Sequence, residues 1–152
     1  MVKYRKLSHV VYHCNYHIVW VPKYRFRILD GIIKELIERD IKVISEWKGA
    51  EIEEMSVQKE HIHIVVSIPP KLSVSDYIGI IKGKTAIKMF KSYPKLRQKP
   101  YWGNHFWAPG YFVNTIGMDE DMIKRYVKYQ EEEEKKIEQQ SSDYGLFQRH
   151  EF

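Results

Sequence analysis

The sequence contains a single cysteine and no long hydrophobic run. Cys14 cannot form an internal disulfide, so we expect a reduced thiol. No apolar stretch approaches the roughly 20 residues that a membrane-spanning helix requires. Residues 1–6 also lack the apolar segment of a signal peptide. We therefore expect a cytoplasmic protein with no membrane partner.

Phosphate-binding loops and internal repeats are also missing. None of the eight glycines belongs to a Walker-type loop, so we expect no nucleotide cofactor. A length of 152 residues with 43% hydrophobic and 30% charged residues is typical of one globular domain. We place that domain at residues 1–140 and a C-terminal tail without a clear element at 141–152.

Positive charge is concentrated in the first two thirds of the chain. Residues 1–100 contain 19 Lys and Arg against 10 Asp and Glu, whereas residues 101–152 contain 6 against 10. The densest basic segment, residues 71–99, has eight cations and one acid. Such a segment can neutralise nucleic-acid phosphates. An ordinary solvated helix face has the same composition, so charge alone leaves both interpretations open.

Residue patterning predicts four strands, two helices between them and a final helix. Runs of β-branched and aromatic residues predict strands at 9–21, 50–57, 61–68 and 111–116. Apolar residues at three- and four-residue spacing predict helices at 30–48, 73–93 and about 119–140. The order β-α-β-β-α-β indicates an α+β, ferredoxin-like (RRM-like) fold, with an antiparallel four-stranded sheet and two helices on one face.

The sequence His61-Ile62-His63 lies in one of these predicted strands. Side chains two apart on a strand point to the same face, so the two histidines project together, about 7 Å apart along the strand. Two imidazoles on one face can hold a divalent metal. Ile62, Ile64 and Val66 then point to the core. A polar strand face without a metal gives the same pattern.

Tyr126 and Gln130 form a second candidate pair in the final predicted helix. Four residues apart, they lie on one helical face, one turn from each other. A glutamine oxygen can bind a metal, and a phenol beside that metal can attack a phosphate. A core tyrosine and a surface glutamine have the same spacing.

Together these residues carry a family resemblance. His61-Ile62-His63 resembles the HUH motif (histidine, bulky hydrophobic residue, histidine) of enzymes that nick single-stranded DNA. Tyr126 with Gln130 resembles the Tyr-x-x-x-Gln motif of one branch, the single-tyrosine transposases of small bacterial and archaeal insertion sequences. Residues 16–25 and 107–112 are similar to further stretches of that branch, and the likeness extends over about residues 8–138.

The resemblance implies a metal-dependent transposase for single-stranded DNA. His61, His63 and Gln130 would bind Mg²⁺ or Mn²⁺, and Tyr126 would form a 5′-phosphotyrosine intermediate. Tyr129 is a nearby phenol, but only Tyr126 stands four residues before a glutamine.

The resemblance also implies partners. These are DNA hairpins at the element ends and a second copy of the chain, with possible exchange of the tyrosine helix. DNA-contacting cations would come from one group of basic residues: Lys23, Arg25, Arg27, Lys82, Lys84 and Lys88.

Two other functions fit the same residues. RNA-binding domains share the β-α-β-β-α-β order, so a non-catalytic or domesticated hairpin-binding protein is one alternative. An HUH nickase that serves replication or transfer is the other. Metal-dependent covalent attachment to DNA separates the first alternative from a transposase, and strand joining separates the second.

Overall fold

The computed structural model describes residues 4–98, 105–117, 128, 132 and 135–140. Residues Lys3–Ile116 form one compact unit, which contains every helix and strand named here. Its elements, in chain order, are β1 (Arg5–Leu7), β2 (Val10–Tyr12), β3 (Asn15–Trp20), η1 (Lys23–Arg25), α1 (Gly31–Trp47), β4 (Glu51–Gln58), β5 (His61–Ser67), α2 (Val74–Ser92), η2 (Pro94–Gln98) and β6 (Phe112–Thr115).

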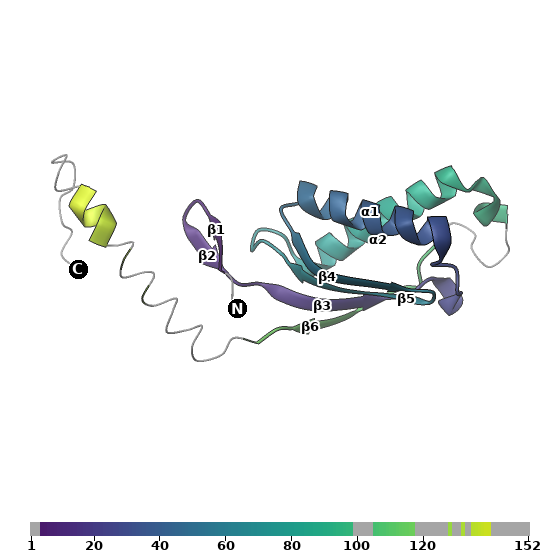
Figure 1. Cartoon of the computed structure of the whole chain (residues 1–152), viewed down its shortest axis with the longest axis horizontal. Coiled ribbons are helices and arrows are strands. Elements are labelled where there is room, and N and C mark those ends of the chain that lie inside the picture. Colours follow the sequence, from purple (N-terminus) through teal and green to yellow (C-terminus); the bar gives the residue numbers. More distant parts are fainter. Residues whose placement is uncertain (1–3, 99–104, 118–127, 129–131, 133–134, 141–152) are drawn as a thin grey trace. The chain divides into compact units, whose positions relative to one another are not determined.

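A four-stranded antiparallel sheet with the order β4-β5-β3-β6 forms the centre of this unit. Both α1 and α2 lie on the same face of the sheet (Figure 1). This order and layering confirm the expected ferredoxin-like α+β fold. Among the described residues of the unit, no helix lies on the opposite face, which we call the open face.

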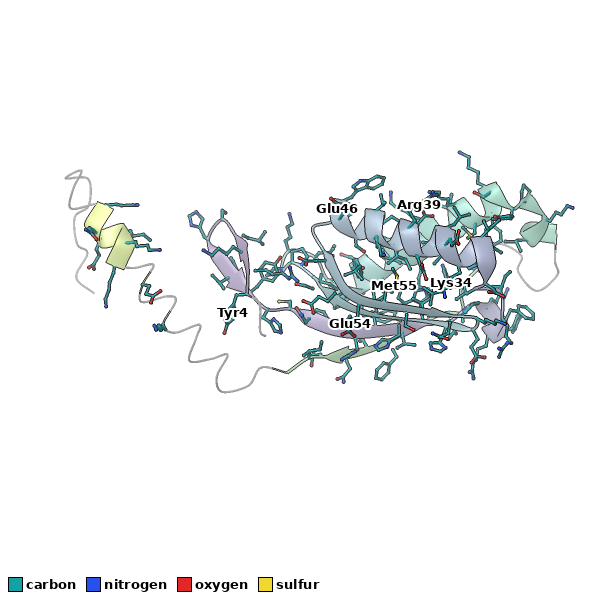
Figure 2. All side chains as sticks on the ribbon, viewed as in Figure 1. Tyr4, Lys34, Arg39, Glu46, Glu54 and Met55 are labelled. Atoms are coloured by element: carbon teal, nitrogen blue, oxygen red, sulfur yellow. The ribbon has the colours of Figure 1, made fainter. Side chains whose placement is uncertain are left out.

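The core lies between the sheet and the two helices. Ile62, Ile64 and Val66 of β5 have no exposed surface, as their alternation predicts. Met55, which pairs with Ile64, packs against this core, whereas the preceding Glu54 is exposed. Figure 2 shows the two side chains on opposite sides of β4. The strand period therefore separates an apolar face under the helices from the open face, where Glu54 is exposed.

The predicted first strand, residues 9–21, is wrong in its extent. Val10–Tyr12 pairs with Arg5–Leu7 in a separate two-stranded hairpin, and only Asn15–Trp20 enters the main sheet. High β propensity runs through both pieces, but propensity does not identify the partner strand. The partner Arg5–Leu7 was missed because two of its three residues are cations.

Other predicted boundaries agree closely with the structure, and the N-caps of the two main helices, Asp30 and Ser73, are the first residues of the predicted ranges. Trp47, an apolar residue of the predicted helix 30–48, is 71% exposed. It occupies the last position of α1 and lines a hollow between α1 and α2. No helix in the described ranges is long and apolar enough to cross a membrane. Residues 135–140, at the end of the predicted final helix, are helical and exposed.

Candidate functional site

His61 and His63 lie on the open face of the sheet, as predicted. His63 stands opposite Ser56 of β4 and Val19 of β3, and His61 stands opposite Gln58. Both imidazoles are partly exposed. The central strand β5 therefore buries its isoleucines beneath the helices and presents its histidines on the helix-free side.

A third imidazole, which sequence reasoning missed, lies beside this pair. Nδ1 of His17 is 3.0 Å from Nε2 of His63, within hydrogen-bonding distance. The ring centroids are 5.2 Å apart and the planes are inclined by 31°. His17 is on β3, on the same face as His63 but two residue pairs along the ladder. The alternation in Tyr16-His17-Ile18 was the available signal, because it places His17 opposite the core face.

The imidazoles of His61 and His63 are suitable ligands for a divalent cation, but the described residues do not contain a complete set of ligands. In 4–98, 105–117, 128, 132 and 135–140, no three His, Cys, Asp or Glu side chains gather closely enough to form a metal site. Two imidazoles on one face can bind such a cation when an oxygen ligand joins them. Gln130, the expected oxygen ligand, and Tyr126, the expected nucleophile, lie outside the described residues.

Lys23, Arg25 and Arg27 flank the histidine strand. Guanidinium nitrogens of Arg25 and Arg27 are 3.7 and 3.8 Å from carboxylate oxygens of Glu60, the residue before His61. Both arginine side chains are about two-thirds exposed, and Lys23 lies 5.4 Å from the centroid of the Tyr24 ring. Exposed guanidinium groups beside a possible metal site can bind DNA phosphates.

The three lysines expected to contact DNA from α2 have different surroundings. Lys82 Nζ donates hydrogen bonds to the carbonyls of Ala108 and Gly110 at 2.8 and 2.9 Å, and burial lowers its pKa. Lys88 Nζ is 2.7 Å from a carboxylate oxygen of Asp40, and Lys84 Nζ is 5.9 Å from the centroid of the Trp47 ring. Lys84, Lys88 and Trp47 line a hollow of about 720 Å³ between the helices.

The two stretches 16–25 and 107–112 meet in the structure. Pro22 and Trp107 form an antiparallel bridge, with backbone hydrogen bonds of 3.0 Å on each side. Trp107 packs edge-on against Trp20 and donates its indole N–H to Thr85 Oγ1 at 2.9 Å. This buried contact joins β3 to the segment that leads into β6.

Residues 10–130 match a protein-family model described as IS200-like transposase. The chain belongs to this family. It is 37% identical over 140 residues to the transposase for insertion sequence element IS200 of Salmonella typhimurium, covering 92% of this chain and 91% of the relative. It is 31% identical over 125 residues to the ISDra2 transposase TnpA of Deinococcus radiodurans, covering 82% and 89%.

Solved structures share the fold of this transposase. A putative transposase from Deinococcus radiodurans superposes with a TM-score of 0.67 at 26% identity, over 84% of this chain and 96% of the other. A REP-associated tyrosine transposase, solved bound to a REP hairpin, has a TM-score of 0.53 at 16% identity, over 97% and 76%. Family membership makes this chain a DNA-cleaving enzyme that acts in transposition.

Proposed function

We propose that this IS200-like transposase cleaves and rejoins single-stranded DNA at the ends of its insertion sequence through a covalent tyrosine intermediate. The observation that carries the proposal is the pair of imidazoles, His61 and His63, on the open face of the sheet. Residues 1–140, with the tyrosine helix at about 119–140, would form the transposase domain. Residues 141–152 would be a tail.

A divalent cation, Mg²⁺ or Mn²⁺, would be held by His61, His63 and Gln130. When bound, it would polarise the scissile phosphate and stabilise negative charge in the transition state. Hard oxygen ligands favour Mg²⁺, whereas two imidazoles shift the preference towards Mn²⁺. No nucleotide is required, because the energy of the cleaved bond is conserved in the phosphotyrosine link.

Tyr126 would act as the nucleophile. Its phenolic oxygen forms a bond to the phosphorus as the bond from phosphorus to the 3′ oxygen breaks. The phenolic proton is lost, and the departing 3′ oxygen gains a proton to become a 3′-hydroxyl. Attack by a different 3′-hydroxyl on the phosphotyrosine then reverses these steps and joins two DNA strands.

DNA hairpins at the element ends and a second copy of the chain would be the partners. Hairpin binding is supported by the REP-associated transposase, which was solved with a REP hairpin, and by the exposed cations Arg25, Arg27 and Lys84. In a homodimer, the tyrosine helix of one copy could reach the histidines of the other.

The decisive experiment uses a labelled single-stranded oligonucleotide that carries an element-end hairpin and its flank. Wild type, Tyr126→Phe, Tyr129→Phe and His61→Ala are incubated with it, with and without Mn²⁺ or Mg²⁺, and resolved on a denaturing gel. We expect a metal-dependent covalent adduct with wild type and most of that adduct with Tyr129→Phe. Tyr126→Phe and His61→Ala should give none.

Other outcomes point to other functions. Tight hairpin binding without any adduct would leave a non-catalytic hairpin-binding protein. An adduct that survives Tyr126→Phe but not Tyr129→Phe would reassign the nucleophile. Cleavage without joining of two element ends would favour a nickase for replication or transfer.

A further inference from the structure

We propose that His17 is a positioning residue of the metal site, which holds the ring of His63 in the orientation that binds the cation. This inference rests on the proposed metal site at His61 and His63. The contact that carries it is the 3.0 Å approach of His17 Nδ1 to His63 Nε2.

The strand register brings the two rings together. His63 pairs directly with Val19, and His17 pairs with Val65, so the two histidines are diagonal neighbours on one face of adjacent antiparallel strands. Diagonal neighbours are within reach of each other when their side chains are aromatic or long. With centroids 5.2 Å apart and nitrogens 3.0 Å apart, the rings meet edge to edge and are not stacked. One nitrogen donates a proton and the other accepts it.

The hydrogen bond determines which nitrogen of His63 is free. In the arrangement we propose, Nε2–H of His63 donates to Nδ1 of His17, so Nδ1 of His63 keeps the lone pair that a cation needs.

Holding a ligating imidazole by its second nitrogen is a general requirement of metal sites. Such a partner fixes the tautomer and the ring orientation, and its loss typically weakens metal binding about 10–100-fold. A carboxylate or a backbone carbonyl is the usual partner. His17 supplies the same function from the neighbouring strand with a ring nitrogen.

Direct Mn²⁺ titration of the full chain, followed by the EPR signal of free Mn²⁺, tests the assignment without DNA. His17→Leu removes the hydrogen bond and should weaken Mn²⁺ binding about 10–100-fold. His17→Asn places an amide at the branch that carries Nδ1 and should keep most of the affinity. His17→Gln places its amide one bond further out and should not restore binding. Pulsed EPR should count two coordinated imidazoles in wild type and in His17→Asn.

The matched control is His9→Leu, which changes an exposed histidine in the turn between β1 and β2. It should bind Mn²⁺ like wild type, and thermal unfolding without Mn²⁺ verifies that every variant is folded. Equal affinity in wild type, His17→Leu and His17→Gln would overturn the positioning role. Three imidazoles in wild type and two in His17→Asn would also overturn it, because His17 would then be a ligand. Wild-type binding that is absent, or that His61→Ala does not reduce, would instead refute the proposed metal site.

Discussion

At the scale of single residues, hydrogen bonds connect side chains that are distant in the sequence, both in the candidate site and in the core. The hydroxyls of Ser45 in α1 and Tyr77 in α2 are 2.7 Å apart, and both side chains are buried. Burial raises the pKa of Tyr77 to about 12, and the hydrogen bond to Ser45 partly opposes that shift. A buried hydroxyl without a partner costs about 1–3 kcal/mol. This pair therefore contributes to the packing of the two helices.

Tyr77→Phe should lower the free energy of unfolding by about 1–3 kcal/mol at neutral pH, because it leaves the Ser45 hydroxyl without its partner. The substitution should also change the alkaline limb of the stability curve. Between an ordinary tyrosine pKa of about 10 and the raised value of about 12, the unfolded chain loses a proton that the folded chain keeps. The contribution of Tyr77 is therefore fully present below the lower value and is lost as pH rises through the upper one.

Urea unfolding of wild type and Tyr77→Phe, from neutral pH to beyond the ordinary tyrosine pKa, measures both effects. The variant should lose less stability than wild type over the alkaline range. Tyr111→Phe, at a partly exposed tyrosine outside the core, is the control and should behave like wild type. Identical curves for wild type and Tyr77→Phe would contradict the role given to this hydrogen bond.

At the scale of the helices and strands, local sequence determines where α1 and α2 begin. Ser73 Oγ accepts a hydrogen bond from the backbone N–H of Asp76 at 3.0 Å, and Asp30 accepts one from Gly31 at 2.9 Å. Such caps satisfy backbone donors that the first helical turn leaves unpaired. This is why both helix starts were predicted correctly without knowledge of the fold.

Ser73→Ala should lower the free energy of unfolding by about 1 kcal/mol, because the N–H of Asp76 loses its acceptor. Ser73→Asp should keep most of the stability, since a carboxylate caps the same donor and is favoured at a helix N-terminus. Chemical denaturation midpoints measure the change. Ser92→Ala, at the exposed far end of α2, is the control. A Ser73→Ala variant as stable as wild type would show that the cap contributes nothing.

At the scale of the whole molecule, two features bear on DNA binding: the positive charge of residues 1–100 and the open face of the sheet. Residues 1–100 carry a net +9, from 19 Lys and Arg minus 10 Asp and Glu. The sheet has one face under α1 and α2 (Figure 1). The histidines of β5 are partly exposed on its other face. Arg25 and Arg27 lie next to Glu60, at the start of the histidine strand. We expect DNA that reaches the histidines to contact Arg25 and Arg27 through its phosphates.

Binding of a single-stranded hairpin oligonucleotide should therefore weaken steeply as salt increases, because each neutralised phosphate releases counterions. The double variant Arg25→Gln/Arg27→Gln should lower the slope of log affinity against log salt by about 0.7 for each lost contact to a single strand. Fluorescence anisotropy at several salt concentrations measures the slope. Lys42→Gln, an exposed cation of α1, is the control. Equal slopes in the double variant and wild type would exclude these arginines as phosphate contacts.

Sequence alone determined the features that depend on neighbours along the chain. The strand period placed His61 and His63 on one face and Ile62 and Ile64 on the other, and the structure confirms both. Helical spacing located α1 and α2 within a residue or two. The order of the elements was sufficient for the ferredoxin-like fold, because few topologies satisfy short, right-handed connections.

Only the tertiary structure decided the features that depend on distant partners. In the structure, residues 9–21 are divided between two sheets, and Trp47 is exposed at the end of α1. Lys82 donates hydrogen bonds to the carbonyls of Ala108 and Gly110. The tertiary structure also brought His17 to His63, across 46 positions of sequence. Propensity and periodicity act over a few residues, whereas pairing register and packing are set by the free energy of the whole fold.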